Sequence, residues 1–248
     1  MKKLWITLCV VAALGFVAVI AYSGRQLGEI DAAYAREAEI HRLVSAYRPD
    51  SAPEHVSHSE NADAAQSAVI NQSVLDLQAQ YPDAVGWLTI PHTQIDYPIV
   101  QYKDNDYFLR RDITGAYANA GTIFMDCRSR NDFASQNTII YGHHMKNGSM
   151  FGSLKHFDDQ AFFDENSSGT VYLPHDTLTL EFFAYMVVDP SDREIFNTAP
   201  NDAYLDYVRQ NARHYREIGL ASGDRIVTLS TCSYEFADAR MVLLARIT

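Results

Sequence analysis

The segment TLSTCSYEFADAR, residues 228–240, places a cysteine at the end of an apolar run and an arginine eight positions later. Cys232 is a candidate nucleophile, because a thiolate attacks carbonyl carbons, and Arg240 is a candidate for the positive group that receives the charge developing on the carbonyl oxygen. The competing interpretation is a buried thiol near a solvated arginine. This segment alone favours neither interpretation, and a catalytic site also requires a general acid or base near Cys232.

That proton carrier must be one of nine histidines. Two of them, His143 and His144, follow an apolar run and a Tyr-Gly pair in IIYGHHMKNGSMFG, at the expected tip of a strand, where functional loops are commonly mounted. Neighbouring side chains of extended backbone point to opposite sides, so only one of the two faces Cys232, and the residues alone do not choose between them. The other seven lie in expected helix, linker or turn segments and have ordinary explanations: His41, His55, His58, His92, His156, His175 and His214.

Two strands are expected to position the cysteine and the arginine. In the run RIVTLSTC the apolar residues Val227 and Leu229 alternate with Ser230 and Cys232. If the apolar set faces the core, Cys232 lies on the opposite surface. The next apolar run, RMVLLARI, begins at Arg240, and a hairpin whose connection spans 233–239 places Arg240 directly opposite Cys232.

The remaining short apolar runs predict a mainly β fold. With helices expected at 66–80 and 201–217, the pattern indicates an eight-stranded, closed or nearly closed β-barrel with N-terminal helices and a helix between the sixth and seventh strands. The first two strands flank PHTQ and are expected to pair antiparallel. The expected strands are 85–90, 95–100, 121–125, 138–141, 170–173, 178–188, 225–231 and 241–247.

The N-terminal segment MKKLWITLCVVAALGFVAVIAYSGR predicts a membrane anchor. The uncharged run 4–22 has 19 residues, which reach roughly 28 Å as a helix, about one hydrocarbon thickness. Lys2 and Lys3 favour a cytoplasmic N-terminus, so a single-pass protein of the cell membrane with an extracellular catalytic domain is expected. The alternative is a secretory signal peptide with AYA at 33–35 as its cleavage site. We favour the anchor, because the apolar run exceeds an ordinary signal-peptide core and the candidate site lies well beyond its end.

The chain after the anchor is expected to have two further parts. Residues 28–47 are rich in helix formers and predict a juxtamembrane helix, whereas 48–65 holds two prolines and many small polar residues and predicts a flexible spacer. The expected organisation is therefore an anchor over 1–23, the helix and spacer over 24–65, and a catalytic domain over 66–248.

Charge and cysteine content exclude several functions. The net charge is −11, and without the two anchor lysines it is −13, which is unlike a nucleic-acid-binding surface. Cys9 lies in the apolar segment, so a disulfide is limited to Cys127 with Cys232, which would consume the candidate nucleophile. We expect Cys127 instead to be a small buried residue at a strand end. The acidic run 157–166 does not match a calcium loop, and we expect neither a metal nor a cofactor.

Taken in order, these motifs resemble the sortases, the membrane-anchored cysteine transpeptidases of the bacterial cell surface. TLSTC with Arg240 eight residues later, preceded by IIYGHHMKNGSMFGSL, carries the resemblance. The segments VGWLTIPHTQIDYPIVQYKDNDYFLRRD and GTIFMD, with the helix between the strands at 178–188 and 225–231, are similar to class B. The resemblance covers roughly 66–248, and the combination of motifs is highly specific.

The resemblance implies an eight-stranded β-barrel and a role for each candidate. The catalytic cysteine falls on Cys232 and the catalytic histidine, the one directly after Tyr-Gly, on His143. Arg240 would position the peptide or stabilise the oxyanion. The doubled histidine departs from the family pattern, since His144 is a second candidate for the acid. The residues implied to line the groove for the substrate peptide are Asn105, Leu109 and Ser230.

The implied reaction is cleavage of a C-terminal sorting signal at a threonine, formation of a thioester on Cys232, and transfer of the exported protein to an amine of peptidoglycan or its lipid-linked precursor. The implied partners are exported proteins with an Asn-Pro-x-Thr-Asn-like pentapeptide, that amine acceptor, and the membrane through the N-terminal anchor. Three alternatives remain at this point: a pilin-polymerising sortase, a surface cysteine peptidase that only hydrolyses, and an inert binding module.

Overall fold

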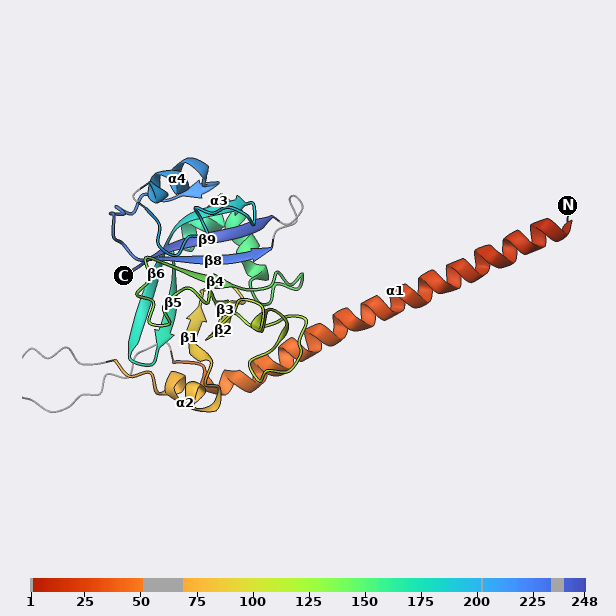
Figure 1. Cartoon of the computed structure of the whole chain (residues 1–248), viewed down its shortest axis with the longest axis horizontal. Helices are drawn as coiled ribbons and strands as arrows, with labels where there is room; N and C mark the ends of the chain where they lie inside the picture. Colours follow the sequence, from red (N-terminus) through yellow and green to blue (C-terminus); the bar gives the residue numbers. More distant parts are fainter. Residues whose placement is uncertain (1, 51–68, 202, 233–238) are drawn as a thin grey trace, which may run out of the picture.

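The strands close into a barrel in the computed structural model, which describes residues 2–50, 69–201, 203–232 and 239–248 (Figure 1). Eight strands follow one another in the order β5-β1-β2-β3-β4-β8-β9-β6, and pairing of β5 with β6 closes the ring. The short strand β7 extends the sheet from β6. The bounds are β1 Ala84–Thr89, β2 Asp96–Gln101, β3 Phe124–Met125, β4 Asn137–Tyr141, β5 Ser168–Leu173, β6 Asp176–Val188, β7 His214–Tyr215, β8 Ile226–Cys232 and β9 Arg240–Ile247.

The eight-stranded barrel predicted from the sequence is confirmed, and so is the antiparallel pairing of β1 with β2. Strand β3 is shorter than the predicted 121–125, because the chain turns at Gly121. This glycine has a φ of 58°, and its N–H donates to the carbonyl of Ala118. The N–H of the next residue, Thr122, donates to the carbonyl of Phe108, so pairing with β4 begins only at Phe124.

Helices cover the barrel at several places (Figure 1). The helix predicted over 201–217 is half as long as expected, because α4 ends at Asn211 and the chain then pairs with β6 as β7. The N–H groups of Arg213 and Arg216 donate to the carbonyls of Tyr185 and Phe183, and this long-range pairing overrides the local helical pattern. The helices are α1 Lys2–Val44, α2 Gln72–Gln80, α3 Gln160–Glu165 and α4 Tyr204–Asn211, with 3₁₀ turns η1 Ser45–Tyr47, η2 Phe108–Arg110 and η3 Gly152–Asp158.

The alternation of β8 places its apolar side chains as predicted. Val227 and Leu229 belong to the cluster of buried side chains inside the barrel. Ile226 belongs to a second cluster, which packs outside the sheet beneath α4. Thr228 and Ser230 share this outer face with Ile226, since residues two apart on a strand point the same way.

One continuous helix joins the apolar N-terminal segment to the barrel. In Figure 1 the first part of α1 projects far from the barrel, whereas its last turns lie against the sheet. Val44 is buried there, and the Arg36 guanidinium contacts the buried Asp112 carboxylate, with 2.7 Å between Nη2 and Oδ2. Among the described residues, α1 is the one helix long and apolar enough to cross a membrane. Most of the predicted spacer, residues 51–65, lies outside the described residues.

Candidate active site

Three neighbouring strands carry the predicted catalytic residues. Strand β8 lies between β4 and β9, ends at Cys232, and pairs antiparallel with β9, which begins at Arg240. Cys232 and Arg240 are register partners. The pairing predicted from the hairpin is thus confirmed at the level of the backbone.

Strand β4 brings His143 to the same edge of the sheet. It runs parallel to β8, with Tyr141 opposite Ser230, and the N–H of Gly142 donates to the Ser230 carbonyl at 3.1 Å. His143 follows Tyr141 by two residues, and Cys232 follows Ser230 by two. Because parallel strands end at the same edge, the histidine and the cysteine stand at neighbouring strand ends.

The ring of His143 is held by one backbone oxygen. Its Nε2 lies 2.7 Å from the carbonyl oxygen of Leu109. A carbonyl only accepts hydrogen bonds, so Nε2 carries the hydrogen, and Nδ1 holds the lone pair when the ring is neutral. The backbone of His143 is fixed as well, since its carbonyl accepts from the N–H of Phe151 at 3.0 Å. This arrangement leaves Nδ1 as the nitrogen able to gain or lose a proton.

Burial lowers the pKa of His143, and the charges of Arg110 and Arg240 lower it further, while the Leu109 carbonyl acts in the opposite direction. The net result is a pKa below the usual value of about 6.5, so the imidazole is mainly neutral at pH 7. Among these causes, the charge of Arg240 has a smaller effect than burial.

The second histidine lies toward the anchor helix. His144 lines a groove between α1 and the segment after β4, together with Tyr34, Arg110 and Lys146. It also forms an isolated antiparallel bridge with Met150. The groove is walled by α1, an element that contributes none of the predicted catalytic residues.

Two of the predicted peptide-binding residues lie beside this edge. Ser230 is buried on the outer face of the sheet, and within the described part of the chain its Oγ has no hydrogen-bond partner. Leu109 is 38% exposed, while its carbonyl accepts a hydrogen bond from Nε2 of His143. A buried hydroxyl without a hydrogen-bond partner lowers the stability of a fold, so the Ser230 hydroxyl is an unusual feature of this strand.

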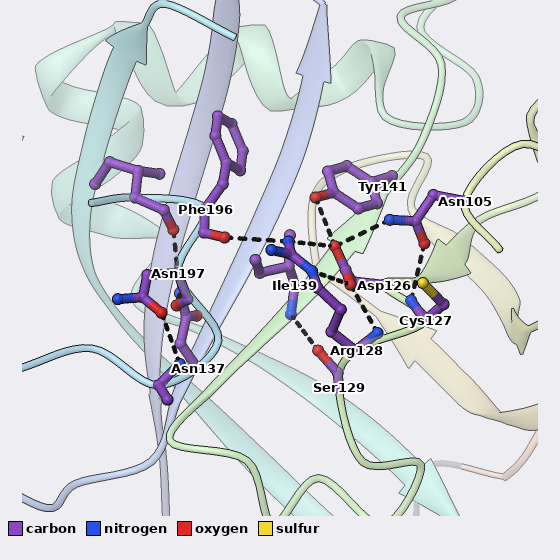
Figure 2. A network of polar contacts seen from close by, with 12 residues as sticks. Asn105, Asp126, Cys127, Arg128, Ser129, Asn137, Ile139, Tyr141, Phe196 and Asn197 are labelled. Atoms are coloured by element: carbon purple, nitrogen blue, oxygen red, sulfur yellow. Dashed lines mark hydrogen bonds and ion pairs between the residues drawn. The ribbon is translucent and has the colours of Figure 1, made fainter. Parts of the chain in front are cut away.

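The third predicted peptide-binding residue, Asn105, is tied into the protein by two hydrogen bonds. Its Nδ2 donates to Oδ2 of Asp126 at 3.1 Å, and its Oδ1 accepts from the N–H of Cys127 at 2.8 Å (Figure 2). One Nδ2 hydrogen is left over after these contacts. The side chain therefore stands in a fixed orientation.

The expectation of a buried Cys127 is wrong, since this thiol is exposed and free. Strand β3 ends at Met125, and a turn follows in which the N–H of Ser129 donates to the Asp126 carbonyl. Asp126, the first residue of this turn, is fully buried, with a relative exposure of 0%. The chain thus exposes the cysteine and buries the carboxylate beside it.

Sequence reasoning missed this carboxylate and two of its three partners, Arg128 and Tyr141. Asp126 accepts hydrogen bonds from Arg128, Tyr141 and Asn105 (Figure 2). The available signal was the run IFMDCRS, where an acidic residue directly follows an apolar strand and an arginine follows two positions later. A carboxylate in such a place is rarely buried without a cationic partner.

Comparison with known proteins agrees with the fold and the motifs. Residues 88–248 match the sortase domain. The chain is 38% identical over 184 residues to sortase B of Listeria monocytogenes, covering 72% of this chain and 75% of that protein. The crystal structure of Clostridium perfringens sortase B matches with a TM-score of 0.67 and 33% identity, over 70% of this chain and 98% of that one. A Streptococcus pyogenes class B sortase involved in pilus biogenesis matches with a TM-score of 0.66 and 32% identity, over 70% and 96%.

The chain belongs to the sortase family of cysteine transpeptidases. Within that family its relatives are class B sortases. Sortases are cell-surface enzymes that act on proteins bearing sorting signals and join them to cell-wall amines, and the apolar part of α1 is consistent with a membrane anchor.

Proposed function

We propose that this sortase cleaves the C-terminal sorting signal of exported proteins at a threonine and transfers each protein to an amine of peptidoglycan or its lipid-linked precursor. The observation that carries the proposal is the register of three adjacent strands. Cys232 pairs with Arg240 on one side, and the strand on its other side leads to His143 two residues beyond the Tyr141–Ser230 pair.

In the first half of the reaction, the Cys232 thiolate attacks the carbonyl carbon of the threonine. The carbonyl oxygen becomes an oxyanion, which the positive Arg240 stabilises. The bond to the next residue then breaks, and the leaving amine takes a proton from Nδ1 of the His143 imidazolium. The products are a thioester on Cys232, a neutral His143 and the released C-terminal peptide.

In the second half, the acceptor amine attacks the thioester carbonyl. Neutral His143 takes a proton from the attacking nitrogen, the carbon–sulfur bond breaks, and Cys232 leaves as a thiolate. The exported protein is then joined to the cell wall by an amide bond. In both halves of the reaction Nδ1 of His143 carries the transferred proton, consistent with the hydrogen bond that holds Nε2 to the Leu109 carbonyl.

The protonation states predict a slow enzyme. Usual pKa values of about 8.5 for cysteine and 6.5 for histidine put only about 1% of sites in the thiolate–imidazolium form. The lowered pKa of His143 reduces that fraction further in the absence of substrate. Substrate binding that strengthens the ion pair would therefore raise the rate.

We assign the peptide groove to the outer face of the sheet, next to the ends of β4 and β8. Ser230 presents a buried hydroxyl there, which a peptide N–H or carbonyl can satisfy. Leu109 offers an exposed apolar side chain for the residues that precede the threonine. Asn105 has one amide hydrogen left for a peptide carbonyl. An Asn-Pro-x-Thr-Asn-like pentapeptide is the assigned signal.

The proposed location follows from the N-terminal segment. Lys2 and Lys3 precede the apolar run and favour a cytoplasmic N-terminus, so the barrel stands outside the cell. Helix α1 leads from the membrane to the barrel and keeps the enzyme close to exported substrates that are still at the membrane.

A peptide assay tests this function. The full chain in detergent micelles is incubated with an Asn-Pro-Gln-Thr-Asn peptide, with and without a peptidoglycan-like amine, and the adduct on Cys232 is followed by intact mass. A thioester that amine converts to a ligated product supports the proposal. Cys232→Ala is the control without a nucleophile. If the same product, with a free carboxylate at the threonine, forms at the same rate with and without the amine, the enzyme is a peptidase instead.

Pilus assembly is the second candidate, favoured by the similarity to the Streptococcus pyogenes class B sortase involved in pilus biogenesis. The chemistry is the same, but the acceptor would be a lysine amine of another pilin subunit. Competing the peptidoglycan-like amine against a lysine-containing pilin peptide separates the two functions. Preferred ligation to the lysine would favour pilus assembly.

A further inference from the structure

A buried carboxylate connects the segments that surround the predicted catalytic residues. Asp126 has no exposed surface and lies in the turn after β3 (Figure 2). We propose that Asp126 is a positioning residue, which holds the His143 ring and its Leu109 partner in place for proton transfer. This inference rests on the proposed role of His143.

The first connection runs along β4. The Tyr141 hydroxyl donates to Oδ2 of Asp126 at 3.0 Å, and Tyr141 precedes His143 by two residues. Tyr141 is also the register partner of Ser230. Asp126 therefore fixes the last side chain of β4 before the strand leads to His143.

The second connection runs through the loop that ends at Leu109. Asn105 donates to Asp126, and the neighbouring Asp104 carboxylate accepts from the N–H groups of Asp106 and Tyr107. The N–H of Leu109 then donates to the Asp106 carbonyl. These turns make the loop stiff between its contact with Asp126 and the carbonyl that bonds His143.

Together the two connections link Asp126 to His143 at two places. One path reaches His143 through the backbone from Tyr141, and the other reaches its Nε2 through the Leu109 carbonyl. Both paths start at the same carboxylate oxygen, Oδ2 of Asp126. Loss of these contacts to Asp126 would therefore free both the backbone that leads to His143 and the Leu109 carbonyl that bonds its ring, which would misplace Nδ1.

The third connection supplies the charge that keeps the carboxylate ionised. Arg128 donates to both oxygens of Asp126, with 2.9 Å from Nε to Oδ1 and 2.8 Å from Nη2 to Oδ2. Burial alone would raise the pKa of Asp126, but the hydrogen bonds and charge of Arg128 outweigh it and lower the pKa. An ionised carboxylate only accepts, which suits Tyr141 and Asn105 as donors. Arg128 also reaches the carbonyl of Phe196, in the segment after β6.

The same loop contains a matched control. Arg130 and Asp132 repeat the spacing of two residues and the two-pronged contact, but both side chains are exposed. Asp132 makes no hydrogen bond to Tyr141 or Asn105 among those of the described residues. Loss of the carboxylate charge at Asp132 thus reproduces the chemical change made at Asp126 without disturbing the contacts to Tyr141 and Asn105.

The decisive comparison is Asp126→Asn against Asp132→Asn in the full chain. Asparagine keeps the shape of the side chain but loses the charge and one acceptor oxygen. We expect Asp126→Asn to lower kcat for sorting-peptide cleavage about tenfold to a hundredfold, with a smaller change in KM, because misplacement of a proton carrier acts on the chemical step. Asp132→Asn should keep the parent kcat.

A second readout does not depend on any substrate. In ¹³C-histidine-labelled chain, the pKa of His143 is measured by NMR titration, with His143→Gln used to assign the signal. In Asp126→Asn the His143 ring should become less buried, so its pKa should rise toward the usual value. In Asp132→Asn the pKa of His143 should not change. If the parent chain cleaves no sorting peptide, the proposed function fails while this titration still tests the positioning role.

Tyr141→Phe keeps the test decisive if Asp126→Asn does not fold. It removes one donor and leaves the Asp126–Arg128 pair intact, so a smaller rise in the His143 pKa and a smaller drop in kcat are expected. An unchanged His143 titration in a folded Asp126→Asn or Tyr141→Phe chain would overturn the proposal.

Discussion

Cys232 and Arg240 are register partners at the end of the β8–β9 ladder, which runs without interruption from the pair Ile226 and Arg246. Paired residues on neighbouring antiparallel strands have their side chains on the same face of the sheet. The relationship is thus set by seven consecutive backbone pairs of the barrel. The strands themselves bring the backbone of Arg240 next to that of the proposed nucleophile.

Substitution of Arg240 is expected to affect both the rate and the pKa of His143. Arg240→Ala removes the proposed oxyanion partner, and we expect kcat/KM to fall about a hundredfold to a thousandfold. It also removes a charge that lowers the pKa of His143, so this pKa should rise. Arg240→Lys keeps the charge and should leave the His143 titration near that of the parent. Equal peptide cleavage by the alanine variant and the parent would rule out the catalytic role.

The doubled histidine can be resolved by separate substitutions. His143→Ala should abolish release of the C-terminal peptide, because Nδ1 is the proposed proton donor for the leaving amine. His144→Ala should keep most of the activity, since His144 lines the groove beside α1. Thioester formation and product release are both measured with the same sorting peptide. Loss of activity confined to the His144 variant would reverse the assignment.

The pH dependence should report the lowered pKa of His143. In the free enzyme the acidic limb of kcat/KM reflects the lower of the two site pKa values, and we expect it below about 6.5. Arg110→Gln removes one charge that lowers the pKa of His143, so this limb should move to higher pH. Lys155→Gln, a loss of charge in η3, serves as the control. If the acidic limb of kcat/KM lies at the same pH in the parent, Arg110→Gln and Lys155→Gln chains, Arg110 has no influence on the pKa of His143.

The same shift has a consequence for stability. Because the pKa of His143 is lower in the folded than in the unfolded chain, the unfolded chain binds more protons once the pH falls to about 6.5 and below. The contribution of His143 to stability is therefore present above that pH and is lost on acidification. The direction is opposite to that of a histidine stabilised by a carboxylate.

The fold was predictable because strand periodicity is local. Alternation in 225–232 identified the buried face of β8, and the length of the following connection placed Arg240 opposite Cys232. The errors arose where distant contacts decide the backbone. His214 and Tyr215 pair with β6 although their sequence continues a helical pattern.

The placement of the candidate residues at neighbouring strand ends was predictable, and the contacts that support them were not. His143 and Cys232 follow apolar runs, which local pattern reveals. The hydrogen bonds of Asp126 to Tyr141 and of Asn105 to Asp126 join residues 15 and 21 positions apart. Such contacts depend on how strands and loops meet in space, and a single sequence carries no direct signal of them.

Ser230 provides a test that separates folding from peptide binding. Its buried hydroxyl has no partner among the described residues, so Ser230→Ala should leave the free energy of unfolding unchanged or raise it by up to about 1 kcal/mol. The KM for the sorting peptide should rise if the hydroxyl bonds the peptide. Thr228→Val is the control on the same face, because Thr228 donates to Asn137 at 2.8 Å. That variant should lose about 1–3 kcal/mol. An unchanged KM in Ser230→Ala would remove Ser230 from the peptide groove.

The contact between α1 and the barrel predicts that the helix is part of the folded domain. Asp112 is buried, with a side chain 2% exposed, and its Oδ2 is bonded by Nε and Nη2 of Arg36. Arg36→Ala leaves that oxygen buried without its charged donor, so we expect the free energy of unfolding to fall by about 1.5–3 kcal/mol in urea titrations of the full chain in micelles. Arg25→Ala breaks the exposed pair with Glu29 on the same helix and should cost less than about 0.5 kcal/mol.

A chain that begins at residue 66, the predicted domain boundary, lacks the whole contact with α1. It should be at least as unstable as Arg36→Ala, because it also loses the buried Val44 and the hydrogen bond from Tyr97 to Glu37. Unfolding is compared under the same conditions for this chain, the Arg36→Ala variant and the parent. If the shortened chain matches the parent, the helix only tethers the barrel and the boundary at 66 is correct. The expected loss instead extends the domain to α1, so that the helix proposed as the membrane anchor also supports the sheet that carries the candidate site.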